Sequence, residues 1–269
     1  MLSQREIAAD IYDMRIETSM AAEAKPGQFL GIYPKDKSML LPRPISICET
    51  GPEENGAYSE TDGAGRERCG GNNVLRIVYR VAGEGTREFS GYREGDSLGL
   101  LGPLGNGFPL EAGRGKRVFL IGGGIGIPPL LELAKRLETA AACKQAVLGY
   151  RNDDLFLKEE FERYASVYVA AEDGSAGVKG NVMDAIGHYK LEADVIFACG
   201  PMPMLRAVKK YARERRIPAY ISLEEHMACG VGACLGCVVK TKDKDPHSYV
   251  NNARICTDGP VFPAESVEI

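Results

Sequence analysis

The stretch "RVFLIGGGIGIPP" at residues 117–129 decides the fold. An apolar run is followed by a glycine-rich turn and two prolines, and residues 128–138 continue with helical spacing. Glycines let a backbone turn sharply and approach a pyrophosphate, whose charge the helix amino terminus attracts. The spacing differs from G-x-G-x-x-G, so a tight strand–helix turn without a ligand is the alternative. The dinucleotide contacts we expect here are Gly123, Gly124, Gly126 and Pro128.

Beyond this turn, short apolar runs alternate with amphipathic segments. Strands are expected at 117–123, 146–151, 166–172, 193–199 and 219–223, and helices at 128–138, 157–165, 181–189 and 203–215. This alternation is typical of a parallel sheet built by right-handed crossovers.

One later strand ends in "CGP", at residues 199–201. Ligands of open α/β sheets gather at the carboxyl ends of the strands, so Cys199, Gly200 and Pro201 are expected near the nucleotide. The alternative for Cys199 is a small buried hydrophobic residue. The segment "GYRNDD" (149–154) leaves the choice of nucleotide open, because acidic side chains favour a ribose hydroxyl and an arginine favours a 2′-phosphate.

The first hundred residues have the period of two that predicts strands. Alternation is clear at 12–16 and 75–81, and shorter strands are expected at 27–33, 43–49 and 96–102. Many short strands separated by Gly and Pro indicate a small barrel or sandwich. Residues 51–73 are rich in Gly and charge, and they predict a long hairpin loop.

Two short motifs in this β half are suited to a flavin nucleotide. In "RPIS" (43–46), Arg43 has a planar fork for a pyrophosphate and Ser46 has a hydroxyl for a polar ring edge. In "GEGT" (83–86), Thr86 is suited to a second phosphate contact. Each motif alone is typical of an ordinary turn. Their position upstream of a nucleotide-type α/β half favours the flavin interpretation.

A third motif, "CGVGACLGC" (229–237), is a glycine-rich cysteine loop. The spacing is C-x4-C-x2-C with a fourth cysteine eighteen residues later, which is typical of a plant-type [2Fe–2S] centre. Structural zinc, the main alternative, favours ligands arranged as two short pairs. The predicted cluster ligands are Cys229, Cys234, Cys237 and Cys256. The remaining cysteines, at 48, 69, 143 and 199, lack ligand-like spacing.

Composition narrows the possible function classes. The chain has 269 residues, a net charge of −4 and no Lys/Arg-rich run, which argues against nucleic-acid binding. No apolar stretch approaches the roughly 18 residues of a membrane span, and the charged amino terminus lacks a signal-peptide core. We therefore expect a cytoplasmic protein with no membrane partner. Thiols stay reduced in the cytoplasm, which disfavours a disulfide explanation for the cysteine loop.

The order "RPIS", "GEGT", "GGGIGIPP", "CGP" resembles the ferredoxin–NADP reductase superfamily across essentially the whole chain. The tail, "MACGVGACLGC" with "ICTDGPVF", is similar to the electron-transfer subunits of dihydroorotate dehydrogenase B. This resemblance implies an antiparallel FAD-binding β-barrel at 1–110, a parallel-sheet α/β domain binding NAD rather than NADP at 111–222, and a [2Fe–2S] domain at 223–269. It also implies a set of FAD-binding residues: Arg43, Pro44, Ile45, Ser46, Val78, Tyr79, Arg80, Gly85 and Thr86.

The resemblance implies an electron path through this chain. A partner catalytic subunit oxidises dihydroorotate at its own FMN in pyrimidine biosynthesis, and electrons pass through [2Fe–2S] and FAD to NAD⁺. It also implies a heterotetramer of two catalytic and two electron-transfer chains. No acid–base constellation for dihydroorotate is evident here, so no catalytic residue is assigned. The alternatives are a subunit of an NADH-dependent ferredoxin:NADP⁺ oxidoreductase or of a sulfide dehydrogenase, and a zinc-stabilised nucleotide sensor.

Overall fold

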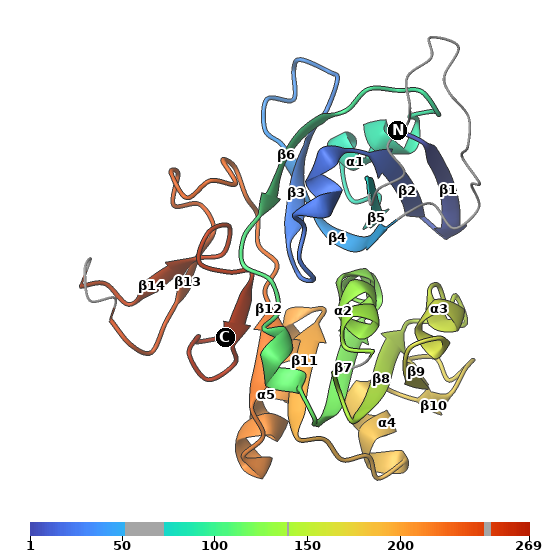
Figure 1. The fold of residues 1–269 in the computed structure, drawn as a ribbon, viewed down its shortest axis with the longest axis vertical. Coiled ribbons are helices and arrows are strands. Elements are labelled where there is room, and N and C mark those ends of the chain that lie inside the picture. Colours follow the sequence, from blue (N-terminus) through green and yellow to red (C-terminus); the bar gives the residue numbers. More distant parts are fainter. Residues whose placement is uncertain (52–72, 139, 245–248) are drawn as a thin grey trace.

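The computed structural model describes residues 1–51, 73–138, 140–244 and 249–269. An antiparallel β unit lies above a parallel α/β unit, and a small C-terminal unit lies beside both (Figure 1). The fold class expected from the sequence is therefore confirmed. Apart from its two end residues, the loop expected at 51–73 lies outside the described residues, as does Cys69.

The first unit is a six-stranded antiparallel sheet, which we call the barrel sheet, with strand order β1-β2-β5-β4-β3-β6. Its strands are β1 (Ser3–Ala8), β2 (Ile11–Glu17), β3 (Phe29–Tyr33), β4 (Arg43–Gly51), β5 (Val74–Arg80) and β6 (Gly99–Leu104), and it also carries helix α1 (Glu84–Ser90) and the 3₁₀ turn η1 (Ser19–Ala22). The charged strand β1 and helix α1 were not among the predicted elements. The amino group of Met1 donates to the Asp96 carbonyl (2.7 Å), and Gly95 N–H donates to the Met1 carbonyl (3.0 Å). These bonds bring the start of β1 beside the segment that leads into β6, which curls the sheet.

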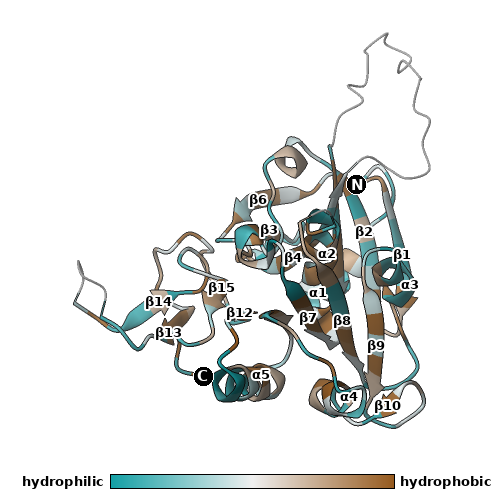
Figure 2. Ribbon diagram, turned by 60° about the horizontal axis from the view of Figure 1, so that its bottom comes forward, coloured by the Kyte–Doolittle hydropathy of each residue, from teal (hydrophilic) through white to brown (hydrophobic). Residues whose placement is uncertain are grey.

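The second unit is a seven-stranded sheet with strand order β10-β9-β8-β7-β11-β12-β15. Its strands are β7 (Arg117–Gly123), β8 (Cys143–Tyr150), β9 (Ser166–Ala171), β10 (Val178–Lys179), β11 (Val195–Cys199), β12 (Ala219–Ser222) and β15 (Val261–Pro263), and its helices are α2 (Leu131–Arg136), α3 (Lys158–Glu162), α4 (Val182–His188) and α5 (Met202–Arg215). All pairs are parallel except β12–β15. The central residues of the strands are hydrophobic and buried (Figure 2), as expected of a parallel sheet covered on both faces.

Two details of this unit differ from the expectation. The helix expected at 128–138 begins as short 3₁₀ turns, η3 (Gly124–Gly126) and η4 (Pro128–Leu130), before α2. A further 3₁₀ turn, η2 (Leu110–Gly113), precedes β7. Strand β15 comes from the C-terminal segment, about 40 residues after the other strands of this sheet. It pairs antiparallel with β12 and forms the edge of the sheet.

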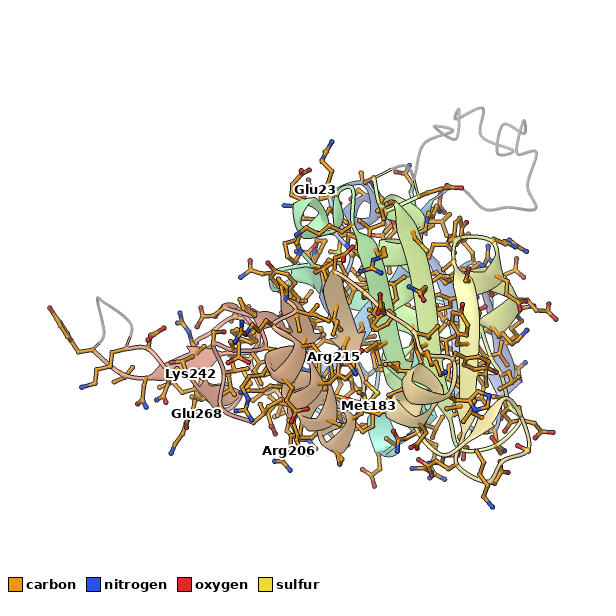
Figure 3. The ribbon with its side chains drawn as sticks, turned by 90° about the horizontal axis from the view of Figure 1, so that it is seen from below. Glu23, Met183, Arg206, Arg215, Lys242 and Glu268 are labelled. Carbon is orange, nitrogen blue, oxygen red and sulfur yellow. The ribbon has the colours of Figure 1, made fainter. Side chains whose placement is uncertain are left out.

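The C-terminal unit is a small hairpin of β13 (Val238–Lys240) and β14 (Asn252–Arg254), with the cysteine loop before it. It packs beside α5, whose Lys209 ammonium donates to the carbonyl of Val267. In Figure 3, Lys242 and Glu268 lie on this unit, to the side of Arg206 and Arg215 on α5. Within the described ranges, no helix is both long and apolar enough to cross a membrane.

Candidate functional site

The glycine turn, residues 122–129, leaves the carboxyl end of β7 and packs tightly against the "CGP" segment. A Cβ built on Gly126 would lie 2.4 Å from the Cys199 carbonyl oxygen and 2.5 Å from Gly200 Cα. A Cβ on Gly123 would meet Met204 Sδ at 2.7 Å and Pro201 Cδ at 3.0 Å. Only glycine permits this approach, so the structure brings together the two motifs that the sequence predicts to share a nucleotide.

Cys199 lies at the carboxyl end of β11 with its side chain 9% exposed. Burial raises the pKa of this thiol to about 12, although a hydrogen bond with Ser222 on β12 acts in the opposite direction. The thiol is therefore uncharged at neutral pH, and it forms part of the packed wall next to the glycine turn. Ser222, which was not predicted, is buried here because the parallel register pairs it with Cys199.

The contacts of the segment after β8 do not distinguish between NAD and NADP. Arg151, Asp153 and Asp154 are all exposed. The carboxylate of Asp154 accepts a hydrogen bond from the Asn152 side chain at 3.0 Å.

The predicted flavin residues converge from three elements of the β unit. A Cβ on Gly85 would lie 2.4 Å from Arg43 Nε, so the guanidinium rests directly on the start of α1. The Arg43 side chain also donates to the Leu41 carbonyl. The Thr86 hydroxyl accepts the N–H groups of Ala82 (2.9 Å) and Gly83 (3.2 Å), which fixes the turn before α1.

Two members of the predicted flavin set, Tyr79 and Val78, are buried. Tyr79 is 1% exposed, stacks on Tyr12 and donates to Gln4 Oε1 at 2.8 Å. Val78 is 3% exposed and packs in the core between the units. Arg80 differs, because its guanidinium lies 3.3 Å from the Cβ position of Gly124. Arg80 thus joins the flavin residues to the glycine turn.

The cysteine loop, residues 229–237, directs backbone N–H groups at sulfur. Val231 N–H (3.5 Å) and Cys234 N–H (3.4 Å) donate to Cys229 Sγ, and Gly236 N–H (3.4 Å) donates to Cys234 Sγ. Gly230 and Gly232 have φ values of +70° and +79°, which allow the chain to wrap in this way. Such amide–sulfur bonds are the contacts that tune an iron–sulfur centre.

The four predicted ligands influence one another electrostatically. Cys234 helps to lower the pKa of Cys229, and Cys237 and Cys229 help to raise the pKa of Cys256. The amides of Val231 and Cys234 lower the pKa of Cys229 to about 6, whereas burial and the Cys237 contact raise the pKa of Cys256 to about 11. In the described part of the chain, no three Cys, His, Asp or Glu side chains are close enough to form a metal site as they stand.

The donor set nevertheless fits an iron–sulfur cluster. Four thiols with glycine-enabled amides around them are the chemistry that such a cluster requires. One pair, Cys237 and Cys256, is buried at 2% and 1% exposure, while Cys234 is exposed. The site is therefore anchored on one side in the protein and open to solvent on the other.

The cysteine loop packs against the barrel sheet next to the flavin residues. A small cavity of about 10 Å³ between them is lined by Phe29, Gly31, Pro42, Pro44, Leu104, Met227, Ala228 and Gly230. Asn106, just after β6, donates to the carbonyls of Thr257 (3.0 Å) and Asp258 (3.1 Å), beside Cys256. Sequence reasoning missed Asn106; the Asn-Gly turn signal at 106–107 marks it.

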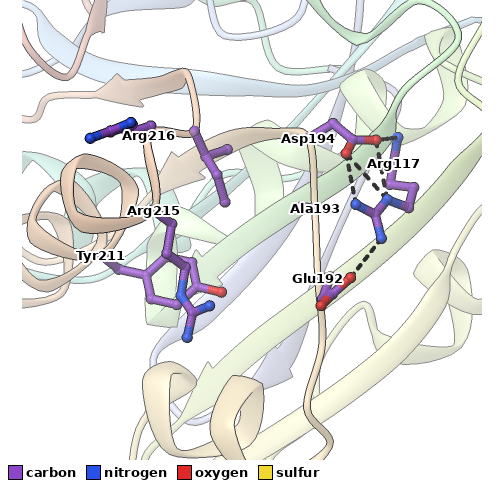
Figure 4. A pocket seen from close by; sticks show the side chains of 8 residues that line it. Arg117, Glu192, Ala193, Asp194, Tyr211, Arg215 and Arg216 are labelled. Carbon is purple, nitrogen blue, oxygen red and sulfur yellow. Dashed lines mark hydrogen bonds and ion pairs between the residues drawn. The ribbon is translucent and has the colours of Figure 1, made fainter.

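A surface cavity of about 430 Å³ (Figure 4) is lined by residues at the start of β7, before β11 and at the end of α5. In it, Arg117 donates to Asp194 (2.8 Å) and to Glu192 (2.9 Å). The Arg215 guanidinium lies 4.6 Å from the Tyr211 ring centroid. The predicted nucleotide residues do not line this cavity.

Two segments of the chain match described protein families. Residues 224–268 match the iron–sulfur cluster binding domain of dihydroorotate dehydrogenase B. Residues 120–210 match the oxidoreductase NAD-binding domain.

Several full-length relatives carry the same name. The chain is 41% identical over 271 residues to the "dihydroorotate dehydrogenase B (NAD(+)), electron transfer subunit" of Shouchella clausii (strain KSM-K16), covering 99% of this chain and 96% of that protein. It is 39% identical to the protein of the same name from Bacillus cereus (strain AH187), with the same coverage.

Solved structures agree with the fold. An NADH-dependent reduced ferredoxin-NADP oxidoreductase structure superimposes with a TM-score of 0.83 at 32% identity, over 99% of this chain and 88% of that chain. A ferredoxin NADP⁺ reductase from Neisseria gonorrhoeae with bound FAD and NADP superimposes with a TM-score of 0.58 at 16% identity, over 79% of this chain and 88% of that chain. The second likeness concerns the fold alone.

Proposed function

The chain belongs to the family of dihydroorotate dehydrogenase B electron transfer subunits, and on this premise we propose how its residues serve that role. It is the oxidoreductase component that uses FAD, a [2Fe–2S] cluster and NAD. When bound, these groups supply an electron path from a partner subunit, which oxidises dihydroorotate to orotate, to NAD⁺, because FAD can exchange single electrons with a cluster and a hydride with nicotinamide.

The observation that carries this proposal is the meeting of three residue sets in one region. Arg80 of the flavin set approaches Gly124 of the glycine turn, and Pro44 of the flavin set lines a cavity shared with the residues before Cys229. The flavin strand β4 therefore lies between the proposed nicotinamide site and the proposed cluster site. This order is the one that an electron path requires.

Each residue set has its own task in this proposal. Arg43 holds the pyrophosphate of FAD, with Pro44, Ile45, Ser46, Gly85 and Thr86 shaping the surrounding surface and Val78, Tyr79 and Arg80 presenting the β5 edge. NAD rests on Gly123, Gly124, Gly126 and Pro128, against Cys199, Gly200 and Pro201. The cluster is held by Cys229, Cys234, Cys237 and Cys256. No residue of this chain acts as acid or base on dihydroorotate.

The partner is an FMN-containing catalytic subunit in a cytoplasmic heterotetramer of two plus two chains. Exposed apolar side chains around the cysteine loop support docking there: Val231 is 52% exposed and Leu235 65% exposed. Leu40 (80%) and Leu41 (49%) are exposed just before Pro42, which lines the cavity against Met227. Exposed apolar residues gathered in this way mark protein contact surfaces.

The docking surface is tested by Leu235→Glu. We expect the purified variant to keep iron and flavin but to lose most of its association with the catalytic subunit in size-exclusion chromatography. Tyr189→Glu is the matched control, because Tyr189 is 44% exposed at the carboxyl-terminal cap of α4, in the α/β unit. Equal association of both variants with the partner would contradict the docking surface.

The function itself is tested by reconstitution. The chain is mixed with a dihydroorotate-oxidising FMN subunit, dihydroorotate and NAD⁺, and NADH formation is followed. We expect NADH to form only when both chains are present.

The superposition at a TM-score of 0.83 favours a second candidate, a subunit of an NADH-dependent ferredoxin:NADP⁺ oxidoreductase. Stable association and turnover with such a partner instead of the FMN subunit would replace the first proposal. The higher identity, 39–41% against 32%, favours the dihydroorotate system.

A further inference from the structure

A group of buried and half-buried charged and polar side chains joins the barrel sheet to the parallel α/β unit. We call it the clasp, and its members are Asp13, Glu49, Thr50, Arg76, Glu132, Lys135 and Glu160. The two units also share a hydrophobic cluster, which includes Cys48 of β4 with Leu131 and Ala134 of α2. Apolar contact holds surfaces together without fixing their angle, whereas hydrogen bonds between charged groups have a required direction.

One arm of the clasp joins β4 to α2. Glu132 is completely buried, and its carboxylate accepts both the N–H and the hydroxyl of Thr50 at 3.0 Å. One turn later, the Lys135 ammonium donates to Glu49 Oε1 at 2.9 Å and to the Thr50 carbonyl at 3.2 Å. Arg136 completes the arm by donating to Glu132 at 2.6 Å.

The other arm joins β5 to α3. Arg76 is 4% exposed and forms a bidentate pair with Asp13, with both bonds at 2.9 Å. The same guanidinium donates to Glu160 of α3 at 3.0 Å and to Glu49 at 3.3 Å. Glu49 therefore contacts cations of both arms, Arg76 and Lys135, and connects them.

A β-bulge in β4 orients the side chains of Glu49 and Thr50. The pairing register of β4 with β5 shifts between Ile47 and Glu49, which is a β-bulge at Cys48. A bulge bends its strand and changes where the following side chains point. Beyond it, Glu49 pairs with Arg76, and Thr50 faces α2.

Each element of the first arm has a proposed cofactor contact at one end and a clasp contact at the other. On β4, Ser46 and Glu49 are three residues apart, which is roughly 10 Å of strand. In the α/β unit, Glu132 lies six positions after Gly126, and the 3₁₀ and α-helical turns between them span roughly 9–12 Å. Helix α2 lies directly below β4 (Figure 1). Both stretches are regular structure, β4 on one side and η3, η4 and α2 on the other.

From this arrangement we infer that the clasp is a positioning device for hydride transfer between flavin and nicotinamide. Thr50, Glu132, Lys135 and Glu49 fix the distance and angle between the strand that carries Arg43–Ser46 and the turn that carries Gly124–Gly126. The inference rests on the proposed function. Small errors in such alignment cost catalysis heavily, since a misplacement of about 1 Å reduces rates up to about a hundredfold.

Lys135→Met tests the inference, because this side chain is 33% exposed and its loss leaves the buried Glu132–Thr50 contact in place. We expect the rate of flavin reduction by NADH, measured by stopped flow, to fall about tenfold or more. The apparent affinity for NADH and the FAD content should change little, because no proposed ligand is touched. Lys135→Arg retains a cation and should restore most of the rate.

A second readout does not depend on turnover. Amide hydrogen exchange should rise in α2 and at the end of β4 in Lys135→Met, and more strongly in Glu132→Gln. Asp194→Asn is the matched control: it removes a salt bridge to Arg117 inside the α/β unit, at the edge away from the barrel sheet. It should alter neither the rate of flavin reduction nor exchange in α2.

The outcomes separate this inference from the proposed function. Normal flavin reduction in both clasp variants, with or without faster amide exchange, would overturn the positioning role. A similar fall in the rate of flavin reduction in Asp194→Asn would also overturn it. Such a fall would show that any loss of stability in the α/β unit slows the reaction. A wild-type chain that contains FAD but is not reduced by NADH would instead count against the proposed function.

Discussion

The glycine turn (122–129) and the cysteine loop (229–237) are both glycine-rich, yet they are held in different ways. In the glycine turn, the protein itself fills the space around the backbone, with the Cys199 carbonyl 2.4 Å from the Cβ position of Gly126. In the cysteine loop, the main contacts are amides pointing at sulfur, and the side chains of Val231 and Leu235 are exposed. The conformation of the glycine turn is therefore set by protein contacts alone, whereas that of the cysteine loop depends on its thiols.

The sulfur atoms in the two regions differ accordingly. Burial raises the pKa of Cys199 to about 12, whereas backbone amides lower the pKa of Cys229 to about 6. A thiolate is the form that binds metal, so Cys229 is prepared for ligation and Cys199 is not. The same residue type is a packing group in one region and a ligand candidate in the other.

The largest expected effect is in the cysteine loop. Cys234→Ser removes one thiol of the exposed pair, and because cluster binding needs four thiolates, we expect iron in the purified protein to fall close to zero. Flavin content should be kept, since none of the proposed flavin residues lies in this loop. Metal analysis measures the iron content, and the visible absorption spectrum measures the cluster and the flavin.

Cys143→Ser is the control for that experiment, because Cys143 is exposed at the start of β8. It should retain the iron content of the wild type. Full iron retention in Cys234→Ser would remove this residue from the ligand set.

Gly126→Ala tests the preformed turn. The added methyl must displace the Cys199–Gly200 backbone, so we expect a loss of about 1–3 kcal/mol in the free energy of unfolding and a clear loss of NADH affinity. Gly187→Ala in α4 is the control, because its Cβ position has no neighbour within 4 Å and alanine favours the helix. Denaturant unfolding and NADH titration distinguish the two. Equal stability and affinity in both variants would show that the turn is not packed as described.

Thr86→Val should have a smaller effect. It removes the hydroxyl that accepts the N–H groups of Ala82 and Gly83, which costs roughly 1 kcal/mol for a lost helix-start contact. Thr86→Ser keeps the hydroxyl and should behave as the wild type. Thermal unfolding of the FAD-bound protein measures the difference, and an unchanged Thr86→Val variant would mean that the hydroxyl does not fix this turn.

The effect that is smallest at neutral pH concerns Cys199, because it develops only in alkaline solution. The folded-state pKa of Cys199 is raised from 9.0 to about 12, so the folded protein keeps this proton while the unfolded chain releases it. The stability contribution is present below pH 9.0 and is lost as pH rises toward about 12. In denaturant titrations, the free energy of unfolding of Cys199→Ala should therefore fall less between pH 9.0 and about 12 than that of the wild type. Identical pH dependence of the two proteins would contradict the burial of the thiol.

The sequence predicted the parts of the site that depend on local spacing. The three cysteines of one loop and the glycines that follow a buried strand are such patterns, and the alternation at 75–81 already grouped Tyr79 with Leu75 and Ile77 on the apolar face. The structure adds that the Tyr79 side chain is held by Tyr12 and Gln4.

The parts that were not predicted depend on contacts between distant segments. Thr50 and Glu132 are 82 residues apart, and Asn106 reaches Thr257 across 151 residues. Strand β1 lacked a clear alternation because its residues are mostly exposed or half-buried, and the bulge at Cys48 breaks the period of two. Such features follow from how the units pack, which local periodicity does not encode.

The most direct test of the central claim is dihydroorotate-dependent formation of NADH by the chain with an FMN-containing catalytic subunit, compared with Cys234→Ser in the same assay. We expect NADH formation by the wild type and its near-complete loss in the variant, which still contains FAD. Undiminished NADH formation by an iron-free Cys234→Ser protein would contradict the proposed path through the cluster.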